Sequence, residues 1–491
     1  MYTGSPALTR NRPKPAAANS KTEPLGGPTI GLAVLITSYF YCLPLGRYSL
    51  GGTASDFRIY DFTLFFFAIF IAGRMRARIR ALTADRSSFH RWAFFLLVLV
   101  WASLIMTYTT GGPARLLFAG LRAYRFTGFL FIAVFIVAIA NTPQRWQFLL
   151  KVFYVNICVQ ALLVCGQEFG IVPHLWPDYW TAGYWIAGNT VPVGTLSPHH
   201  KQIGVIMILG IAMSIAYISV APRTQKVILV APIVSMLMAL AVSGARTALL
   251  GLGAYVLAYV YIHRGRAIPT MMFIGFSLIV VYVYSPSWLT DPLESELDAR
   301  ITARVEKLGF AGLSGDRMSI YTSDIPYALM NNPFIIVAGA GFQNIKYATA
   351  GATGAHNNYL QALIELGIVG FLVYMRFLIA ILRRLRFAAR KARTRLEAAI
   401  ASDVWAVFIG ILATMMVGET IWAQYSMFTL AGQVMTLVGL ACCPLTWNLK
   451  REREEQMRRA EAPDSNPKRF NGGMQTPFRR GDVAHGDAAR R

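Results

Sequence analysis

Charged residues are scarce in this sequence of 491 residues, in which Asp, Glu, Lys and Arg together make up only 14%. A typical soluble domain carries about 25%. Hydrophobic residues make up 55% of the chain and occur in long blocks such as WAFFLLVLVWASLIM and GFLFIAVFIVAIA. These blocks have no polar helical face, which is the pattern that a bilayer selects. The composition therefore excludes an ordinary soluble domain and predicts a membrane protein.

Acidic residues are the scarcer of the two charged kinds. The sequence has 24 Asp and Glu against 47 Lys and Arg, which gives a formal net charge of +23. The basic surplus lies mainly in short loops between apolar blocks and in the two tails. Retention of Lys and Arg on the cytoplasmic side of a membrane produces this distribution. We therefore expect a lipid bilayer as a partner and no nucleic acid.

Cysteines are few, and several sequence motifs are missing. The five cysteines lie inside apolar blocks without metal-ligand spacing to histidine, so packing is their expected role. There is no HExxH motif and no Walker A sequence, and the lack of the latter argues against ATP-driven transport by this chain. The Asp-x-Asp pair of metal-dependent nucleotide-sugar transferases is absent as well. We expect no cofactor and no metal.

The apolar blocks predict an all-α polytopic membrane protein with about twelve transmembrane helices. Nine of them fall in residues 28–284 and three in residues 357–447. Their approximate positions are 28–46, 59–73, 92–108, 114–140, 147–166, 202–220, 226–242, 245–262, 268–284, 357–381, 402–419 and 425–447. The remaining segments are a disordered tail at 1–27, a loop at 167–201, a large loop at 285–356 between the ninth and tenth helices, and a disordered basic tail at 448–491.

The loops predict the orientation of the chain. With the N-terminus in the cytoplasm, the cytoplasmic loops are basic, as in RMRARIRALTADRSSFHR and RRLRFAARKARTR. The alternate loops TTGGP and GETIWAQYS contain no Lys or Arg. Both tails are then cytoplasmic, and both long loops lie on the outer side. The loop at 167–201 is rich in Trp and Tyr, which suits either the membrane interface or stacking on sugar rings.

A small set of basic groups lies on the predicted outer face. Arg246 stands in SGARTALLGL at the turn between two expected helices, and Arg317 stands in GDRMSIY within the large loop. His356 and Asn357 open HNNYLQALIELGIVG. An arginine at a bilayer boundary can simply extend to the lipid headgroups, and a lone histidine is more often structural. Their shared place on one face favours a functional site.

Three sequence blocks resemble a known family. SGARTALLGL, GDRMSIYTSDIPYALMNNPFIIVAGAGFQN and HNNYLQALIELGIVGFLVY follow one another in an order similar to the O-antigen ligase and polymerase superfamily, over about residues 190–380. Members of that family are multi-spanning glycosyltransferases that take glycans from undecaprenyl diphosphate. The resemblance implies catalytic roles for Arg246, Arg317 and His356. One departure is the stretch FIIVAGAGF after the Asn-Pro pair, which is slightly longer than usual.

The resemblance implies a transferase of the bacterial inner membrane whose active site faces the periplasm. Arg246 and Arg317 would bind the lipid diphosphate with their planar guanidinium groups and stabilise the charge that develops as the glycosidic bond breaks. His356 would take a proton from the acceptor hydroxyl. One attack on the anomeric carbon, from the face opposite the diphosphate, would invert its configuration without a metal.

The acceptor stays open at this stage. A polymerase, slightly favoured, would pass the chain to another lipid-linked glycan, and a ligase would pass it to a lipid A core oligosaccharide. A protein acceptor is a third version, and polysaccharide assembly proteins could be partners. The alternative from another class is a flippase for lipid-linked saccharides. A transporter, however, places its charges along a cavity reachable from both sides.

Further candidates lie near the same face. Arg122 and Arg125 stand inside an apolar block, where a charge is costly and often functional, and Arg122 is a third candidate for binding the diphosphate. Arg115 stands closer to the boundary and could be an anchor. Candidates for binding the acceptor or supporting the site are His199, His200, Asn357 and Glu419. Glu419 and Asp316 are also alternative general bases.

Overall fold

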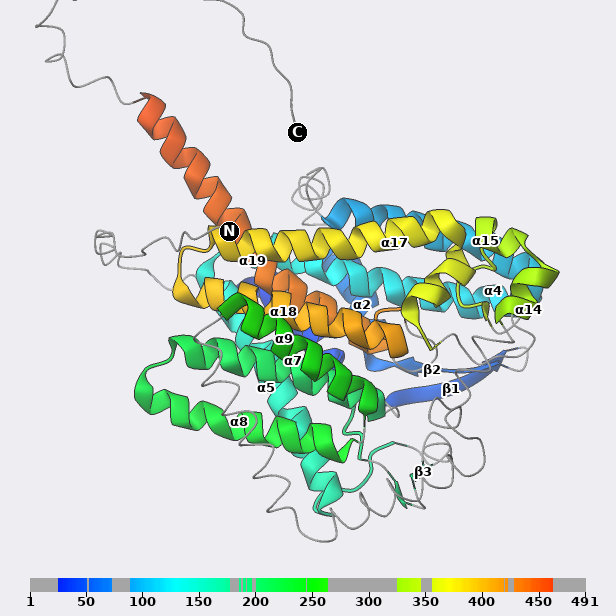
Figure 1. The fold of residues 1–491 in the computed structure, drawn as a ribbon, viewed down its shortest axis with the longest axis horizontal. Coiled ribbons are helices and arrows are strands. Elements are labelled where there is room, and N and C mark those ends of the chain that lie inside the picture. Colours follow the sequence, from blue (N-terminus) through cyan, green and yellow to red (C-terminus); the bar gives the residue numbers. More distant parts are fainter. Residues whose placement is uncertain are drawn as a thin grey trace, which may run out of the picture. The chain divides into compact units, whose positions relative to one another are not determined.

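A computed structural model of the full chain gives the arrangement of its helices (Figure 1). It describes residues 25–50, 53–72, 89–176, 185–186, 189–190, 192–196, 200–243, 245–263, 325–345, 356–418, 420–422 and 428–461. The helices are α1 (Gly26–Ser38), α2 (Ile59–Phe67) with the π-helix η1 (Ala68–Ala72), α4 (Phe89–Ile139), α5 (Pro143–Glu168), α7 (His200–Val220), α8 (Arg223–Val242), α9 (Arg246–His263), α14 (Ile325–Asn331), α15 (Phe334–Ala338), α17 (Asn358–Lys391), α18 (Arg395–Val417) and α19 (Phe428–Glu461). Two short antiparallel hairpins, β1 (Pro44–Leu50) with β2 (Thr53–Arg58) and β3 (Trp185–Ile186) with β4 (Asn189–Thr190), complete the described elements.

Seven of the described helices are long and apolar enough to cross a membrane, namely α4, α5, α7, α8, α17, α18 and α19. They confirm the prediction of an all-α polytopic membrane protein. The helices α1, α2 and α9 are shorter and also apolar. The expected helix at 268–284 lies outside the described residues. The count of twelve therefore stays a prediction.

Helix α4 is two helices joined by a sharp break. Gly112 has a φ of 70° and a ψ of −170°, and Pro113 follows it, so the helical hydrogen bonds cannot continue through this point. The Nε1 of Trp101 donates to the Oγ1 of Thr127 over 3.0 Å. Residues 26 apart on a straight helix would be separated by about 39 Å. The chain therefore turns back at Gly112, as the separate predicted helices at 92–108 and 114–140 require.

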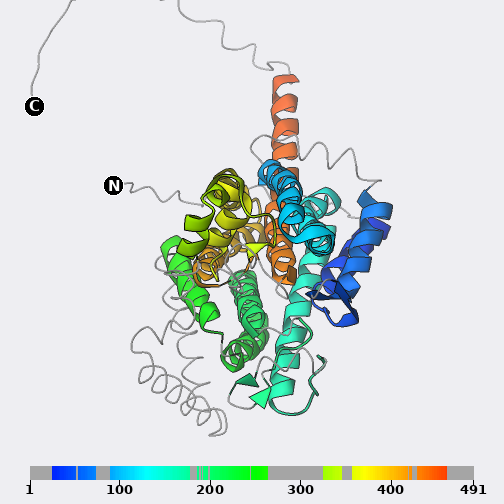
Figure 2. The same cartoon turned by 90° about the vertical axis from the view of Figure 1, so that its right-hand side faces the viewer.

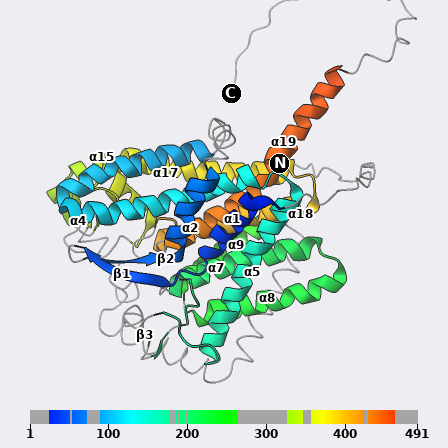
Figure 3. The ribbon, with the colours of Figure 1, turned by 180° about the vertical axis from the view of Figure 1, so that it is seen from behind.

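The chain between α1 and α2 differs from the prediction. The helix expected at 28–46 ends at Ser38, and Pro44 begins the hairpin of β1 and β2 instead (Figure 3). Pro44 has no N–H to continue a helix, and the strand register shifts between it and Gly46. Hydrophobicity is similar on both sides of Ser38, which is why the hairpin was not predicted.

The first part of α19 lies between other helices in the view of Figure 2. The Nε2 of Gln433 donates to the carbonyl of Tyr39 over 2.8 Å, and the Nε1 of Trp146 donates to the carbonyl of Leu440 over 2.8 Å. Gly439 lies directly against Ala133 of α4. Residues 449–461 form the end of α19, where Lys450 and Glu454 are an exposed pair 3.8 Å apart. The predicted start of the C-terminal tail at residue 448 therefore falls within a helix.

The helix ends form two groups, which we name by what they carry. At the site end, α7, α9, α17 and α19 begin: Gln202 donates to Thr429, and Gly204 lies against Ala248. At the arginine end, α9 and α17 end and α18 begins: the Nδ2 of Asn448 donates to the carbonyl of Lys391 over 3.3 Å. The arginine end holds Arg383, Arg384, Arg386, Arg390, Lys391, Arg393 and Arg395.

Helices α9 and α18 cross at two glycines. A Cβ on Gly410 would lie 2.5 Å from the carbonyl oxygen of Gly251, so no side chain fits between the two backbones. Small residues at such crossings let membrane helices approach closely. This contact places the end of α18 beside the start of α9, which is where the candidate site lies.

Candidate active site

The start of α17 carries His356 in a constrained backbone conformation. Its φ is 48°, in the left-handed region that few side chains adopt. Asn357 caps the helix: its Oδ1 accepts from the backbone N–H of Tyr359 over 2.9 Å and from that of Leu360 over 3.1 Å. Its Nδ2 donates to the carbonyl of Met416 over 3.0 Å. The half-buried His356 is therefore fixed next to the end of α18.

Arg246 begins α9 beside the same part of α18. A Cβ on Gly418 would lie 3.1 Å from the Cγ2 of Thr247, so the start of α9 lies directly against the residues that follow α18. Met416, to which Asn357 donates its hydrogen bond, lies only two residues before Gly418 in the chain. The structure thus brings the backbones of Arg246 and His356 to one place, as the sequence predicted for its outer-face residues. The side chain of Arg246 is not among the described ones.

The start of α7 reaches the same region. A Cβ on Gly204 would lie 2.9 Å from the Cβ of Ala245 and 2.5 Å from that of Ala248. His200 stands one turn earlier, so α7 begins beside the start of α9. Four other predicted site residues lie outside the described ones, namely Arg317, Asp316, His199 and Glu419. Their roles stay predictions.

A buried turn, residues 339–345, links the large loop to α4. The hydroxyl of Thr107 donates to the carbonyl of Phe342 over 3.1 Å, and the N–H of Phe342 donates to the Oγ of Ser103 over 3.1 Å. The Nη2 of Arg115 donates to the carbonyl of Gln343 over 2.6 Å, and the Nη1 of Arg122 donates to its side-chain oxygen. Both arginines are buried. In this structure they hold the turn, so the binding of a diphosphate by Arg122 stays a prediction.

The same turn is also bonded to α17. The N–H of Ala340 donates to the carbonyl of Ile364 over 2.7 Å, and the N–H of Gly341 donates to that of Glu365 over 3.0 Å. These carbonyls are available because α17 breaks at Gly367, whose φ is 68° and ψ −175°. The turn therefore connects α4 to the short helical segment that begins at Asn358, two residues after His356.

The family comparison matches residues 231–375 to the family described as O-antigen ligase. This chain carries an O-antigen ligase domain. The resemblance found in the sequence is thereby confirmed, and the domain implies a glycosyltransferase-type membrane enzyme. The matched domain runs from α8 into α17 and contains Arg246, Arg317 and His356. No curated protein matches the chain.

The O-antigen ligase domain contains a buried carboxylate that the sequence analysis missed. The Oε1 of Glu365 accepts from the Nε2 of Gln361 over 3.0 Å, and its Oε2 accepts from the Nε1 of Trp422 over 2.8 Å. The Trp422 ring packs against Phe126 and Phe342, with centroids 5.1 and 5.3 Å away. An acidic residue inside an apolar helix was the available signal. Glu365 ties the segment after α18 to α17 and thereby supports the site.

Two more arginines lie outside the O-antigen ligase domain. Arg125 forms a buried two-point ion pair with Asp61, with Nε–Oδ1 and Nη2–Oδ2 distances of 2.7 and 2.6 Å, so its role is structural. Arg58 is 2% exposed, and its guanidinium carbon lies 5.7 Å from the centre of the Trp176 ring. Among the described residues, no hydrogen-bond partner reaches its Nε or Nη1. Arg58 was not among the predicted site residues, because it falls between the helices predicted at 28–46 and 59–73.

Proposed function

We propose that the protein transfers a glycan from undecaprenyl diphosphate to an acceptor at the periplasmic face of the bacterial inner membrane. One observation carries this proposal: the O-antigen ligase domain contains the predicted Arg246, Arg317 and His356, and the helix starts at Arg246 and His356 converge on the end of α18. Convergence of a base and a phosphate-binding group is what glycan transfer from a lipid diphosphate requires.

The donor diphosphate carries several negative charges next to a low-dielectric bilayer. Arginine suits such a group because its planar fork binds phosphate oxygens at two points and stays protonated. Arg246 and Arg317 bind the diphosphate, and Arg122 lies close to the turn that follows the large loop. These charges stabilise the leaving group as the bond between the anomeric carbon and the phosphate oxygen breaks.

His356 acts as the general base, the role that histidine fills most often in enzymes. The acceptor hydroxyl oxygen attacks the anomeric carbon and loses its proton to the imidazole, and undecaprenyl diphosphate leaves. A single displacement inverts the anomeric configuration. The chemistry needs no metal, because the arginines supply the positive charge. Asn357 fixes the backbone beside His356, and we propose His200, His199 and Glu419 as further groups that support the acceptor.

The charge distribution supports the orientation. Seven basic residues occupy the arginine end between Arg383 and Arg395, and the positive-inside rule puts such clusters in the cytoplasm. The site end then faces the periplasm, and both termini are cytoplasmic. A flippase would spread its charged groups along a cavity open to both sides. The gathering of Arg246 and His356 at one end favours the transferase over the flippase.

The test uses purified full-length protein with an undecaprenyl-diphosphate-linked oligosaccharide, with and without lipid A core. Arg317→Ala and His356→Ala each reduce transfer by about a hundredfold or more. Arg383→Gln, which removes an arginine at the other end, leaves the rate unchanged. A ladder of products from donor alone identifies the slightly favoured polymerase, and one product that requires lipid A core identifies a ligase. No turnover by folded protein with either acceptor contradicts the proposal.

Orientation is tested separately by labelling. A His356→Cys variant, in a background without the five native cysteines, reacts with a membrane-impermeant thiol reagent added to the periplasmic side. Labelling only from the cytoplasmic side would refute the transferase orientation.

A further inference from the structure

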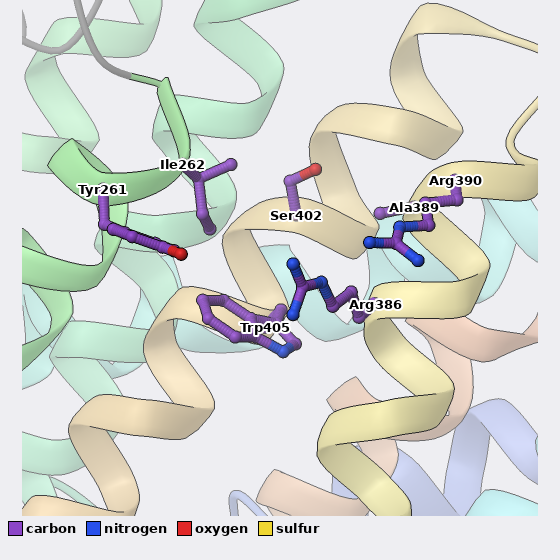
Figure 4. A pocket seen from close by; sticks show the side chains of 7 residues that line it. All are labelled: Tyr261, Ile262, Arg386, Ala389, Arg390, Ser402 and Trp405. Carbon is purple, nitrogen blue, oxygen red and sulfur yellow. The ribbon is translucent and has the colours of Figure 1, made fainter. Parts of the chain in front are cut away.

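A pocket opens at the arginine end between α9, α17 and α18 (Figure 4). Its volume is about 410 Å³, and its lining residues are Tyr261, Ile262, Arg386, Ala389, Arg390, Ser402 and Trp405. Figure 4 shows the guanidinium groups of Arg386 and Arg390 directed from α17 toward the space in front of α18. None of these residues belongs to the transferase site, which lies at the opposite helix ends.

The pocket carries two positive charges without a matching acid. Arg386 and Arg390 are four residues apart and so lie on one face of α17, where like charges destabilise a helix. No carboxylate of the described residues pairs with either of them. The adjacent Asp403 is buried and accepts from the Nε2 of His263 over 3.2 Å, on α9. An anion in the pocket would offset this repulsion.

The surroundings of the pocket favour a lipid over a soluble anion. Tyr261 and Trp405 line the same pocket as the two arginines with aromatic rings, and such rings gather at the level of lipid headgroups. Further along the same helices, toward the site end, apolar side chains are exposed. Leu257 is 73% exposed on α9, and Leu372 is 55% exposed on α17. A ligand with an anionic head and apolar chains matches both features.

We propose that this pocket binds the phosphate headgroup of an anionic phospholipid. The two guanidinium groups donate to the phosphate oxygens, the Ser402 and Tyr261 hydroxyls line the same space, and the acyl chains lie on the exposed apolar faces of α9 and α17. Basic pockets between transmembrane helices bind acidic headgroups in this way. The proposal does not depend on the transferase reaction.

Thermal unfolding of the purified full-length protein in a neutral detergent tests the proposal. Short-chain phosphatidylglycerol, short-chain phosphatidylcholine and inorganic phosphate are added in separate titrations. A ligand that binds only the folded state raises Tm in a concentration-dependent way. We expect a saturable rise with phosphatidylglycerol and no rise with phosphatidylcholine or inorganic phosphate.

Variants locate the effect in the pocket. Arg386→Gln with Arg390→Gln weakens the affinity for phosphatidylglycerol by about tenfold or more, because charge-assisted hydrogen bonds are lost. Arg383→Gln with Arg395→Gln removes the same charge from exposed positions at the same end and keeps the affinity. Ala389→Phe fills the pocket while keeping both arginines, and it also weakens binding. Ala389→Phe therefore tests the pocket even if the double arginine variant does not fold.

Three results would overturn the proposal. An equal Tm rise with inorganic phosphate would identify a site for a soluble anion. Equal loss of affinity in the two double variants would show general attraction to a basic surface. An unchanged affinity in folded Arg386→Gln with Arg390→Gln and in Ala389→Phe would place the lipid elsewhere.

Discussion

The two ends of the helices carry their charge in opposite ways. Toward the site end, charged side chains are buried and bonded: Arg122 to Gln343, Glu365 to Trp422, and Arg125 to Asp61. At the arginine end, Arg386 and Arg390 are exposed and have no carboxylate partner among the described residues. Arginines toward the site end are thus fixed by buried partners, whereas Arg386 and Arg390 at the arginine end are accessible.

The difference follows from the cost of burial. A buried charge is tolerated only with a close partner and satisfied hydrogen bonds, and those bonds also fix its position. Glycan transfer needs groups held at fixed positions, because small displacements of reacting groups reduce the rate strongly. Exposed arginines contribute little to stability but determine membrane orientation and attract acidic lipids. Substitutions of charged residues at the two ends should therefore differ both in stability and in activity.

The largest expected effect comes from breaking the buried ion pair. Asp61→Ala leaves the guanidinium of Arg125, which is 2% exposed, without its carboxylate. We expect a loss of about 3–5 kcal/mol in unfolding free energy, because an unpaired buried charge is strongly destabilising. The measurement is thermal unfolding in detergent, together with the fraction of monodisperse protein. The double variant Asp61→Leu with Arg125→Met removes both charges and should recover most of the loss. A stable Asp61→Ala protein would show that water or lipid compensates the arginine.

Much of the fold could be predicted from the sequence, because long apolar blocks and basic loops have few alternatives in a bilayer. Predicted helices such as 147–166 and 402–419 fall on α5 and α18. The β1–β2 hairpin was missed, since hydrophobicity does not mark where a helix gives way to strands. The prediction that Arg246 and His356 lie at the same end of the helices followed only from the alternation of basic loops with loops that lack Lys and Arg.

The second largest effect is expected at the buried turn. Gly341 has a φ of 95°, and a Cβ on it would lie 2.4 Å from the Oγ1 of Thr107. Gly341→Ala should therefore cost about 2–3 kcal/mol through backbone strain and overpacking. Transfer activity should fall as well, because the turn holds Gln343 against Arg122. Thermal unfolding and the rate of glycan transfer measure the two effects.

Gly120→Ala on α4 is the matched control for that substitution. A Cβ there meets nothing within 4 Å, and alanine is the better helix former. The control should keep or slightly raise Tm and keep full activity. Equal losses in both variants would mean that α4, rather than the buried turn, is sensitive to added volume.

The support of the site could not be predicted from one sequence. Arg115 and Gln343 are 228 residues apart in the chain, and nothing in either segment indicates the other. Arg122 was expected to bind the diphosphate because a charge in an apolar block is costly, and the same cost explains its bond to Gln343. Residue type and burial limit the roles of a buried charge, but only the folded arrangement shows which partner it has.

The smallest effect on stability gives the sharpest comparison of the two ends. Asn357 caps α17 at the site end, and Thr394 caps α18 at the arginine end, where its Oγ1 accepts from the N–H of Glu397 over 3.1 Å. Replacing either residue by alanine removes one cap and should cost about 1 kcal/mol. Matched losses of Tm are therefore expected.

Activity should separate these two variants. Asn357→Ala releases the backbone next to His356 and should lower kcat/KM by about tenfold to a hundredfold, because the proposed base is no longer held in place. Thr394→Ala, equally destabilised, should keep the wild-type rate. Asn357→Asp keeps the acceptor for the two backbone N–H groups but loses the donor to Met416, so an intermediate rate would assign the effect to that contact. If both alanine variants lost activity in proportion to stability, the cap would act on folding alone, and the constrained backbone at His356 would have no special part in the transfer.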